Sequence, residues 1–188
     1  MGFDLIQIAA ADGNARVRYA AISQIASLGH QDATEAESLL RKSLSTDPEP
    51  DVQAAAADAI GALGLSNAYQ DLAAAYNATN EWLVKFSIVA ALGELGNPAA
   101  FDLLKDAVNA DNELIATAAI GALGELGDER ALPILLTYVG DQDWQVRHRL
   151  VQALSHFQQP AAQDALQTLA QDESPIVAEA AMHHISAS

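Results

Sequence analysis

Residues 81–96 read EWLVKFSIVAALGELG, and the spacing of their apolar side chains decides the fold. The apolar residues that share one helical side are Val84, Ile88, Leu92 and Leu95. They recur at intervals of three and four residues, which is the period of an amphipathic α-helix. The closing glycine is typical of a helix end, because glycine readily adopts the left-handed conformation needed there. The stretch therefore predicts one helix with a defined end.

The same pattern recurs along the whole chain. Its leading apolar residues lie 35, 32, 31, 31 and 31 residues apart. These residues are Val17, Val52, Val84, Ile115, Val146 and Val177. Self-similarity at a nearly constant period is typical of a repeat architecture.

Most copies carry signals for both helix ends. Three residues before each leading residue stand Asn14, Glu49, Glu81, Asn112, Asp143 and Ser174, most of which are good N-cap residues. Proline follows at the first helical position in two copies, as Pro50 and Pro175. The predicted stops are Gly29, Gly64, Gly96 and Gly127.

A second, shorter helix is predicted between the copies. The segments are 34–45, 67–77, 98–109, 129–139 and 160–171, and a short helix over 3–11 precedes the first copy. A single helix pair cannot bury its own apolar faces, so neighbouring pairs must stack. The prediction is an all-α protein, an α-solenoid of about six helix pairs that forms one domain over residues 1–188.

Composition supports this fold and excludes several functions. Hydrophobic residues make up 51% of the chain, but 40 residues are alanine, which suits closely stacked helices rather than one large core. The formal net charge of −16 argues against nucleic-acid partners, since these are held mainly through their phosphates. No apolar run is long enough to insert into a membrane, and the first residues carry no secretory signal pattern, so we expect a cytoplasmic protein.

Cofactor and metal chemistry find little support in the sequence. The chain has no cysteine, and its five histidines lack zinc-type spacing. His183 and His184 are adjacent and diverge on a helix, whereas His148 and His156 are eight residues apart. We therefore expect no metal site and no bound cofactor, and no motif identifies a catalytic residue.

The repeats resemble a known family. The start Asp-x4-Val-Arg occurs twice, at Asp12 and Asp141, and the close ALGELG occurs twice, at 91–96 and 122–127. These features resemble the HEAT-like repeats of phycobilin lyases, over nearly the whole chain. Longer stretches look most like the phycobilisome degradation proteins of the NblB type; they are 14–21, 47–58, 81–89 and 143–147. The resemblance implies an accessory protein that binds phycobiliproteins such as phycocyanin or allophycocyanin and takes part in phycobilisome degradation, with bilin detachment as a further step.

An open arc on the first helix of each pair is the predicted binding groove. Five positions point away from the buried side of the helix. They lie two residues before the leading residue and two, six, nine and ten residues after it. Large aromatic residues occupy this arc as Tyr19, Trp82, Phe86 and Trp144, and His148 lies there too. Small residues on the intervening helices are expected to leave room between them; they are Ala54, Gly61, Gly121 and Gly124. Such a groove suits a protein partner or a planar bilin, although the tryptophans could instead only shield helix ends.

Basic residues offer two further sites. Arg18, Lys85 and Arg147 share one position, where they either receive bilin propionates or, as base rates favour, bond aspartates and carbonyls of adjoining repeats. Arg149, near His148 and Trp144, is the best local candidate for holding an acidic ligand group.

Two alternatives to the degradation role stay open at this point. One is a bilin lyase subunit that attaches or transfers the chromophore, with the bilin as ligand or substrate. The other is a generic HEAT-repeat scaffold for protein–protein interaction, with no pigment role.

Overall fold

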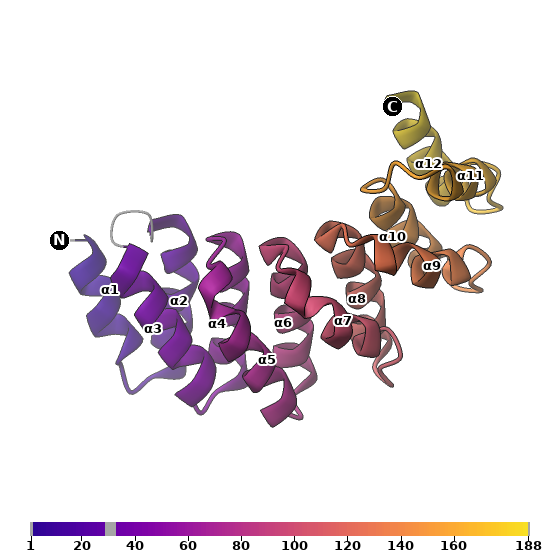
Figure 1. The fold of residues 1–188 in the computed structure, drawn as a ribbon. Helices are drawn as coiled ribbons and strands as arrows, with labels where there is room; N and C mark the ends of the chain where they lie inside the picture. The colour runs from indigo at the N-terminus through magenta and orange to yellow at the C-terminus, as the bar shows by residue number, and fades with distance from the viewer. Residues whose placement is uncertain (1, 29–32, 188) are drawn as a thin grey trace. The chain divides into compact units, whose positions relative to one another are not determined.

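The structure is a computed structural model that describes residues 2–28 and 33–187, and within these ranges it is helical with no strand (Figure 1). The first helices of the pairs are α2 (Ala15–Leu28), α4 (Pro50–Ala62), α6 (Trp82–Leu95), α8 (Glu113–Leu126), α10 (Trp144–Leu154) and α12 (Pro175–Ala187). The second helices are α3 (Ala33–Thr46), α5 (Tyr69–Ala78), α7 (Phe101–Ala107), α9 (Leu132–Leu135) and α11 (Pro160–Leu169), and α1 (Gly2–Ala10) precedes them all. Short 3₁₀ turns are η2 (Ser66–Ala68), η3 (Pro98–Ala100), η4 (Glu129–Ala131) and η5 (Leu136–Tyr138). The predicted all-α class is confirmed.

The chain forms two compact units, Met1–Asn97 and Pro98–Ser188. In the first unit, α2, α4 and α6 pack side by side, while α1, α3 and α5 pack against them (Figure 1). In the second unit, α8, α10 and α12 pack side by side, and α7, α9 and α11 lie against them. Both units are thus two layers of helices, one of first helices and one of second helices.

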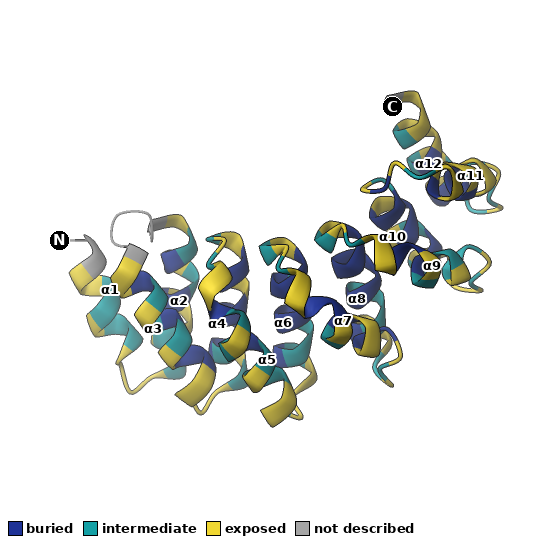
Figure 2. Cartoon of the chain, viewed as in Figure 1, coloured by how far each residue is buried: buried dark blue, intermediate teal, exposed yellow. Residues whose placement is uncertain are grey.

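The core of each unit lies between its two layers (Figure 2). The leading residues Val52, Val84, Ile115 and Val177 are buried as predicted. Val146 is only half-buried, and Val17 is exposed over 38% of its surface. The reason for Val17 is a shallow, mostly apolar hollow of about 430 Å³ between α1 and α2, which leaves this residue open to solvent.

Helix ends follow the sequence signals closely. Gly64, Gly96 and Gly127 have φ angles of 63°, 59° and 64°, the left-handed conformation that favours glycine. The fourth predicted stop, Gly29, lies outside the described residues. The side chains of Asn14, Asn112 and Asp143 accept backbone N–H groups of the first turn, whereas those of Glu49 and Glu81 do not. The longer glutamate side chain suits this capping geometry poorly.

The second helices vary more in length than predicted. Helix α3 has 14 residues, as many as α2, so it is not the shorter member of its pair. The segment 129–139 instead divides into η4, a four-residue α9 and η5. Periodicity marks both segments as helical, but it does not fix how far each continues with α-type hydrogen bonds.

The glycines of the first helices serve close packing rather than open space. A Cβ atom at Gly61 would lie 2.9 Å from the Ala91 Cα, and one at Gly124 would overlap the Ala153 Cα. These residues let α4 approach α6, and α8 approach α10, more closely than any side chain would allow. The prediction that Gly61 and Gly124 leave room in a groove is wrong for this reason.

Candidate functional site

A groove of about 390 Å³ crosses α2, α4 and α6 in the first unit. It is called the α4 groove below. Its lining residues are Ala15, Arg16, Tyr19, Glu49, Asp51, Val52, Ala54, Ala55, Asp58, Leu83 and Ser87. All of them lie on the first helices or, for Glu49, at the N-cap of α4. The layer that was predicted to carry the binding surface therefore does carry a groove.

Small residues on α4 make the floor of the groove. Ala54 takes the position that Tyr19 takes on α2 and Phe86 on α6. Because its side chain is one methyl group, the space above α4 is left open between the two neighbouring helices. Ala54 thus lines the groove, and Tyr19, which is 48% exposed, forms part of the wall; that this groove binds a partner stays a prediction.

The rim of the groove is acidic. Glu49, Asp51 and Asp58 contribute three carboxylates, and Arg16 contributes the one guanidinium among the lining residues. Glu49 and Asp51 stand at the start of α4, where the positive end of the helix dipole favours negative charge. These polar residues were not among the predicted site residues. A signal for Asp58 did exist, since it lies six residues after Val52 and so within the open arc.

The environment of Asp58 in this groove changes the pKa of its carboxyl. Burial by the surrounding side chains raises the pKa of the Asp58 carboxyl, although the residue still reaches solvent. The hydroxyl of Ser87, a buried residue on α6, donates a hydrogen bond to this carboxyl and lowers its pKa, but this effect is the smaller one. A carboxylate that has lost part of its hydration gains more from a nearby cation than a fully hydrated one does.

The other predicted aromatic residues do not line this groove. Trp82 is 48% exposed and Phe86 is half-buried, and both stand on α6 next to the lining residues Leu83 and Ser87. Trp144 is 40% exposed and belongs to the second unit. That the predicted aromatic residues all share one face of the molecule therefore stays a prediction.

In the second unit, Trp144, His148 and Arg149 all start from the first half of α10. Arg149 is exposed and lies across α8, where its Cδ is 2.9 Å from the point that a Cβ of Gly121 would occupy. Its Nη1 donates a hydrogen bond of 3.0 Å to Gln152 Oε1. The space expected at Gly121 is thus filled by the arginine side chain, whose guanidinium makes no ion pair within the described residues.

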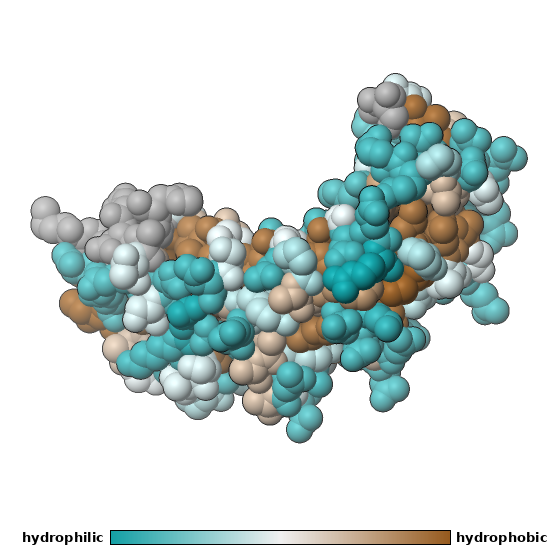
Figure 3. All heavy atoms as spheres, viewed as in Figure 1, coloured by the Kyte–Doolittle hydropathy of each residue, from teal (hydrophilic) through white to brown (hydrophobic). Residues whose placement is uncertain are grey.

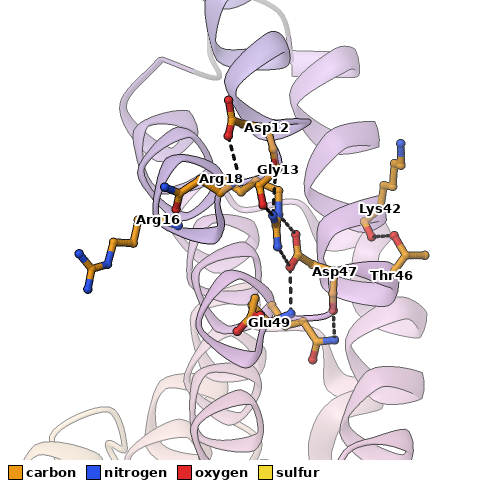
Figure 4. Close-up of polar contacts among 10 residues, drawn as sticks. Asp12, Gly13, Arg16, Arg18, Lys42, Thr46, Asp47 and Glu49 are labelled. Atoms are coloured by element: carbon orange, nitrogen blue, oxygen red, sulfur yellow. Dashed lines mark hydrogen bonds and ion pairs between the residues drawn. The ribbon is translucent and has the colours of Figure 1, made fainter.

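Arg18, Lys85 and Arg147, which share one position of the repeat, form the basic row. Two of these three residues, the arginines, connect neighbouring repeats. Arg18 donates to both carboxylate oxygens of Asp47, at 2.7 and 2.9 Å, and to the Asp12 carbonyl at 3.0 Å (Figure 4). Arg147 repeats the arrangement with Asp172, at 2.7 and 2.8 Å, and with the Asp141 carbonyl. Each arginine therefore joins the loop before its own helix to the loop before the next first helix.

Lys85 departs from this arrangement. Its ammonium lies 5.0 Å from the ring centroid of Tyr76, a cation–π contact, rather than in a pair with an aspartate.

The paired arginines lower the pKa of Asp47 and of Asp172, chiefly through the side-chain hydrogen bonds. Because Arg18 and Arg147 are bonded in these pairs, the prediction that residues of the basic row contact adjoining repeats is confirmed for both arginines.

Two classes of site find no support in the part of the chain that the structure describes. Across residues 2–28 and 33–187, no group of three or more histidine and acidic side chains is placed to hold a metal ion. The same ranges contain no helix both long and apolar enough to cross a bilayer.

Hydrophilic residues cover much of the visible face of the first unit, interrupted by hydrophobic ones (Figure 3).

Helix pairs stacked in two layers, as in each unit of this chain, define the class of α-solenoid repeat proteins. The profile of HEAT repeats matches residues 4–92, 79–143 and 135–188, so the chain belongs to the HEAT-repeat family. No curated protein matches it at a significant level.

Solved structures share the fold at low sequence identity. A chain of the complex of CpcE and CpcF of phycocyanin lyase from Nostoc sp. PCC7120 aligns with a TM-score of 0.75 and 18% identity, over 100% of this chain and 77% of that one. An engineered protein aligns with a TM-score of 0.67 and 15% identity, over 99% and 96% of the two chains. A designed armadillo repeat protein in complex with the peptide (KR)4 aligns at 0.65 and 18%, over 98% of each chain.

Proposed function

We propose that this chain is a phycobiliprotein-binding accessory protein of phycobilisome turnover, of the NblB type, and that it acts in the cytoplasm through the α4 groove. The observation that carries the proposal is the groove itself, about 390 Å³ in volume with Tyr19 in its wall. The resemblance of residues 14–21, 47–58, 81–89 and 143–147 to phycobilisome degradation proteins supports the choice of partner. Similarity to a phycocyanin lyase chain over the full length supports the same choice.

The charge of the groove favours binding of a protein over holding of a free bilin. A bilin carries two propionate groups, and carboxylates at Glu49, Asp51 and Asp58 would repel them. Arg18 and Arg147, which could otherwise receive these groups, are already bonded to aspartates. The adaptor role therefore comes first, and detachment of a bilin would follow from binding and distorting its carrier.

A bilin lyase subunit is the second candidate. One observation in the second unit favours it. Arg149 is a guanidinium without an acidic partner among the described residues, and exposed Trp144 and half-buried His148 start from the same half of α10. A ring to stack on and a cation for a carboxylate are what a bilin requires.

Mixing the protein with chromophore-bearing phycocyanin separates these roles. Gel filtration with absorbance detection should show co-elution with an unchanged phycocyanin spectrum if the adaptor role is correct. Loss of covalently attached bilin would instead support detachment chemistry. Elution of both proteins at their separate volumes would contradict both pigment roles and leave the generic scaffold.

Two aromatic substitutions locate the contact. Tyr19→Ala removes a ring that is half exposed in the wall of the groove, and we expect phycocyanin to bind about tenfold more weakly, as for the loss of an interface aromatic. Trp144→Ala removes a comparably exposed ring from the other unit and serves as the matched control. The reverse result, with loss of binding only in Trp144→Ala, would move the site to α10. Circular dichroism of each variant should show unchanged helicity.

A further inference from the structure

The α4 groove combines an apolar floor, an aromatic wall and an acidic rim. Ala54, Ala55 and Val52 provide the floor, and Tyr19 the aromatic wall. The groove therefore offers both carboxylates and apolar surface to a single ligand. The ligand that fits both is a long aliphatic chain that ends in a positive charge.

We infer that the α4 groove binds a partner protein through a lysine or arginine side chain on that partner's surface. The methylene stem would lie on the alanine floor, and the charged head would reach the carboxylate of Asp58. Asp51 lies two helical turns earlier on α4, about 10 Å away along the axis, and adds a longer-range attraction. The inference deepens the proposed function by stating what the groove recognises, and it depends on that function only for the identity of the partner.

Charge complementarity selects a basic occupant over the alternatives. The lining residues carry three carboxylates against the single guanidinium of Arg16, and the chain as a whole has a formal charge of −16. An acidic or phosphorylated segment would be repelled, and a purely apolar segment would leave the rim carboxylates without compensation. A cation over the tyrosine face adds an attraction that neither alternative offers.

Removal of Arg16 should have an effect that only a basic occupant of the groove explains. It is exposed at the edge of the groove, and it extends away from the Arg18–Asp47 pair (Figure 4). Because it carries the same charge as the proposed occupant, its removal should strengthen binding. A structural role for Arg16 predicts no such gain.

The direct test is an NMR titration of the isotopically labelled full chain with a short capped peptide. The probe is acetylated Gly-Ala-Arg-Ala-Gly amide, and its control has citrulline, which is neutral but similar in shape, in place of arginine. We expect amide shifts to concentrate in residues 15–19, 49–58 and 83–87 with arginine and to be much smaller with citrulline. Equal shifts with both peptides, or shifts spread over the second helices, would overturn the inference.

Variants sharpen the test by the direction of their effects. Asp58→Asn keeps the shape and an acceptor for Ser87 but removes the charge, so the peptide Kd should rise about fivefold, the upper end for a partly exposed ion pair. Arg16→Gln should lower the Kd. Asp106→Asn removes an exposed carboxylate from α7 and should leave the Kd unchanged, which controls for net charge. Equal weakening by Asp58→Asn and Asp106→Asn would overturn the inference.

The two proposals fail separately. If the peptide binds the groove but phycocyanin does not co-elute, the basic-side-chain inference stands and the pigment role is wrong. If phycocyanin co-elutes but the peptide and Asp58→Asn have no effect, the pigment role stands and this inference is wrong.

Discussion

Two arginines, Arg18 and Arg147, each connect one repeat to the next by the same set of contacts. In both cases the guanidinium donates to two oxygens of an aspartate in the loop before the next first helix. The same aspartates, Asp47 and Asp172, also accept the N–H two residues ahead, which orders the loop. The shared repeat position of these arginines predicted contacts with aspartates and carbonyls of adjoining repeats as one of two roles, but it did not single out Asp47 and Asp172 as the partners.

Arg147→Ala should destabilise the fold strongly. The side chains of Arg147 and Asp172 are each only 7% exposed, so the substitution leaves a buried carboxylate without its partner. We expect the free energy of unfolding to fall by about 3 kcal/mol, measured by urea unfolding monitored by circular dichroism. Arg147→Lys restores the charge but not the two-pronged geometry and should recover part of the loss. A change below measurement error in Arg147→Ala would contradict the structural role.

The same pair should make stability depend on pH. Arg147 lowers the pKa of Asp172 in the folded chain below its ordinary value of 3.8, so the folded state binds fewer protons than the unfolded state does. The contribution of the pair is therefore complete above the ordinary pKa and is lost as the pH falls through the folded pKa. The difference in unfolding free energy between the native chain and Arg147→Ala should shrink as urea titrations move from neutral to acidic pH. A difference that stays constant down to strongly acidic pH would show that the ion pair contributes nothing.

The groove residues were only partly predictable. Tyr19 and Ala54 follow from the helical register, because both stand two positions after a leading residue. Arg16 and Leu83 stand one position before it, in the first turn, and Ser87 three positions after it on the buried side. Whether such residues reach the groove depends on the distance between neighbouring first helices. The spacing of apolar residues along one helix does not predict that distance.

At the scale of elements, the approach of neighbouring first helices is set by glycine and alanine. Gly61 faces Ala91 across α4 and α6, and Gly124 faces Ala153 across α8 and α10. These positions are equivalent in the repeat, nine residues after the leading residue, so both units use the same contact. The sequence predicted that small residues stand here, but it could not tell open space from contact.

Gly124→Ala should therefore be destabilising although alanine is the better helix former. The added Cβ overlaps the Ala153 backbone, which cannot yield as a flexible side chain would. Overpacking of this kind costs about 1–3 kcal/mol, which outweighs a propensity gain of about 1 kcal/mol. Thermal unfolding should show a clearly lower Tm.

Gly140→Ala is the matched control for this substitution. Gly140 lies in the same unit, has no atom within 4 Å of its potential Cβ and has no left-handed φ angle. Its Tm should stay within about a degree of the native value, as for a neutral surface change. An equal Tm loss in both variants would contradict close packing as the cause.

At the scale of the whole molecule, the repeat accounts for the composition. Alanine is abundant because each first helix packs between neighbours, and a compact core with many aromatic residues is not needed. The period predicted the fold class, and the match to HEAT repeats confirms it. The partner could not be predicted in the same way, because repeats report how helices stack, whereas recognition depends on the few residues that break the repeat, such as Ala54 and Asp58.

Hydrogen–deuterium exchange of the full chain, with and without chromophore-bearing phycocyanin, shows whether the α4 groove is the surface that contacts the partner. We expect slower exchange on binding in peptides that cover residues 15–19, 49–58 and 83–87, the segments that line the α4 groove. The second helices α3 and α5 should exchange as they do in the free chain. Protection confined to those second helices, or no protection in any peptide, would contradict the claim that this groove is the binding site.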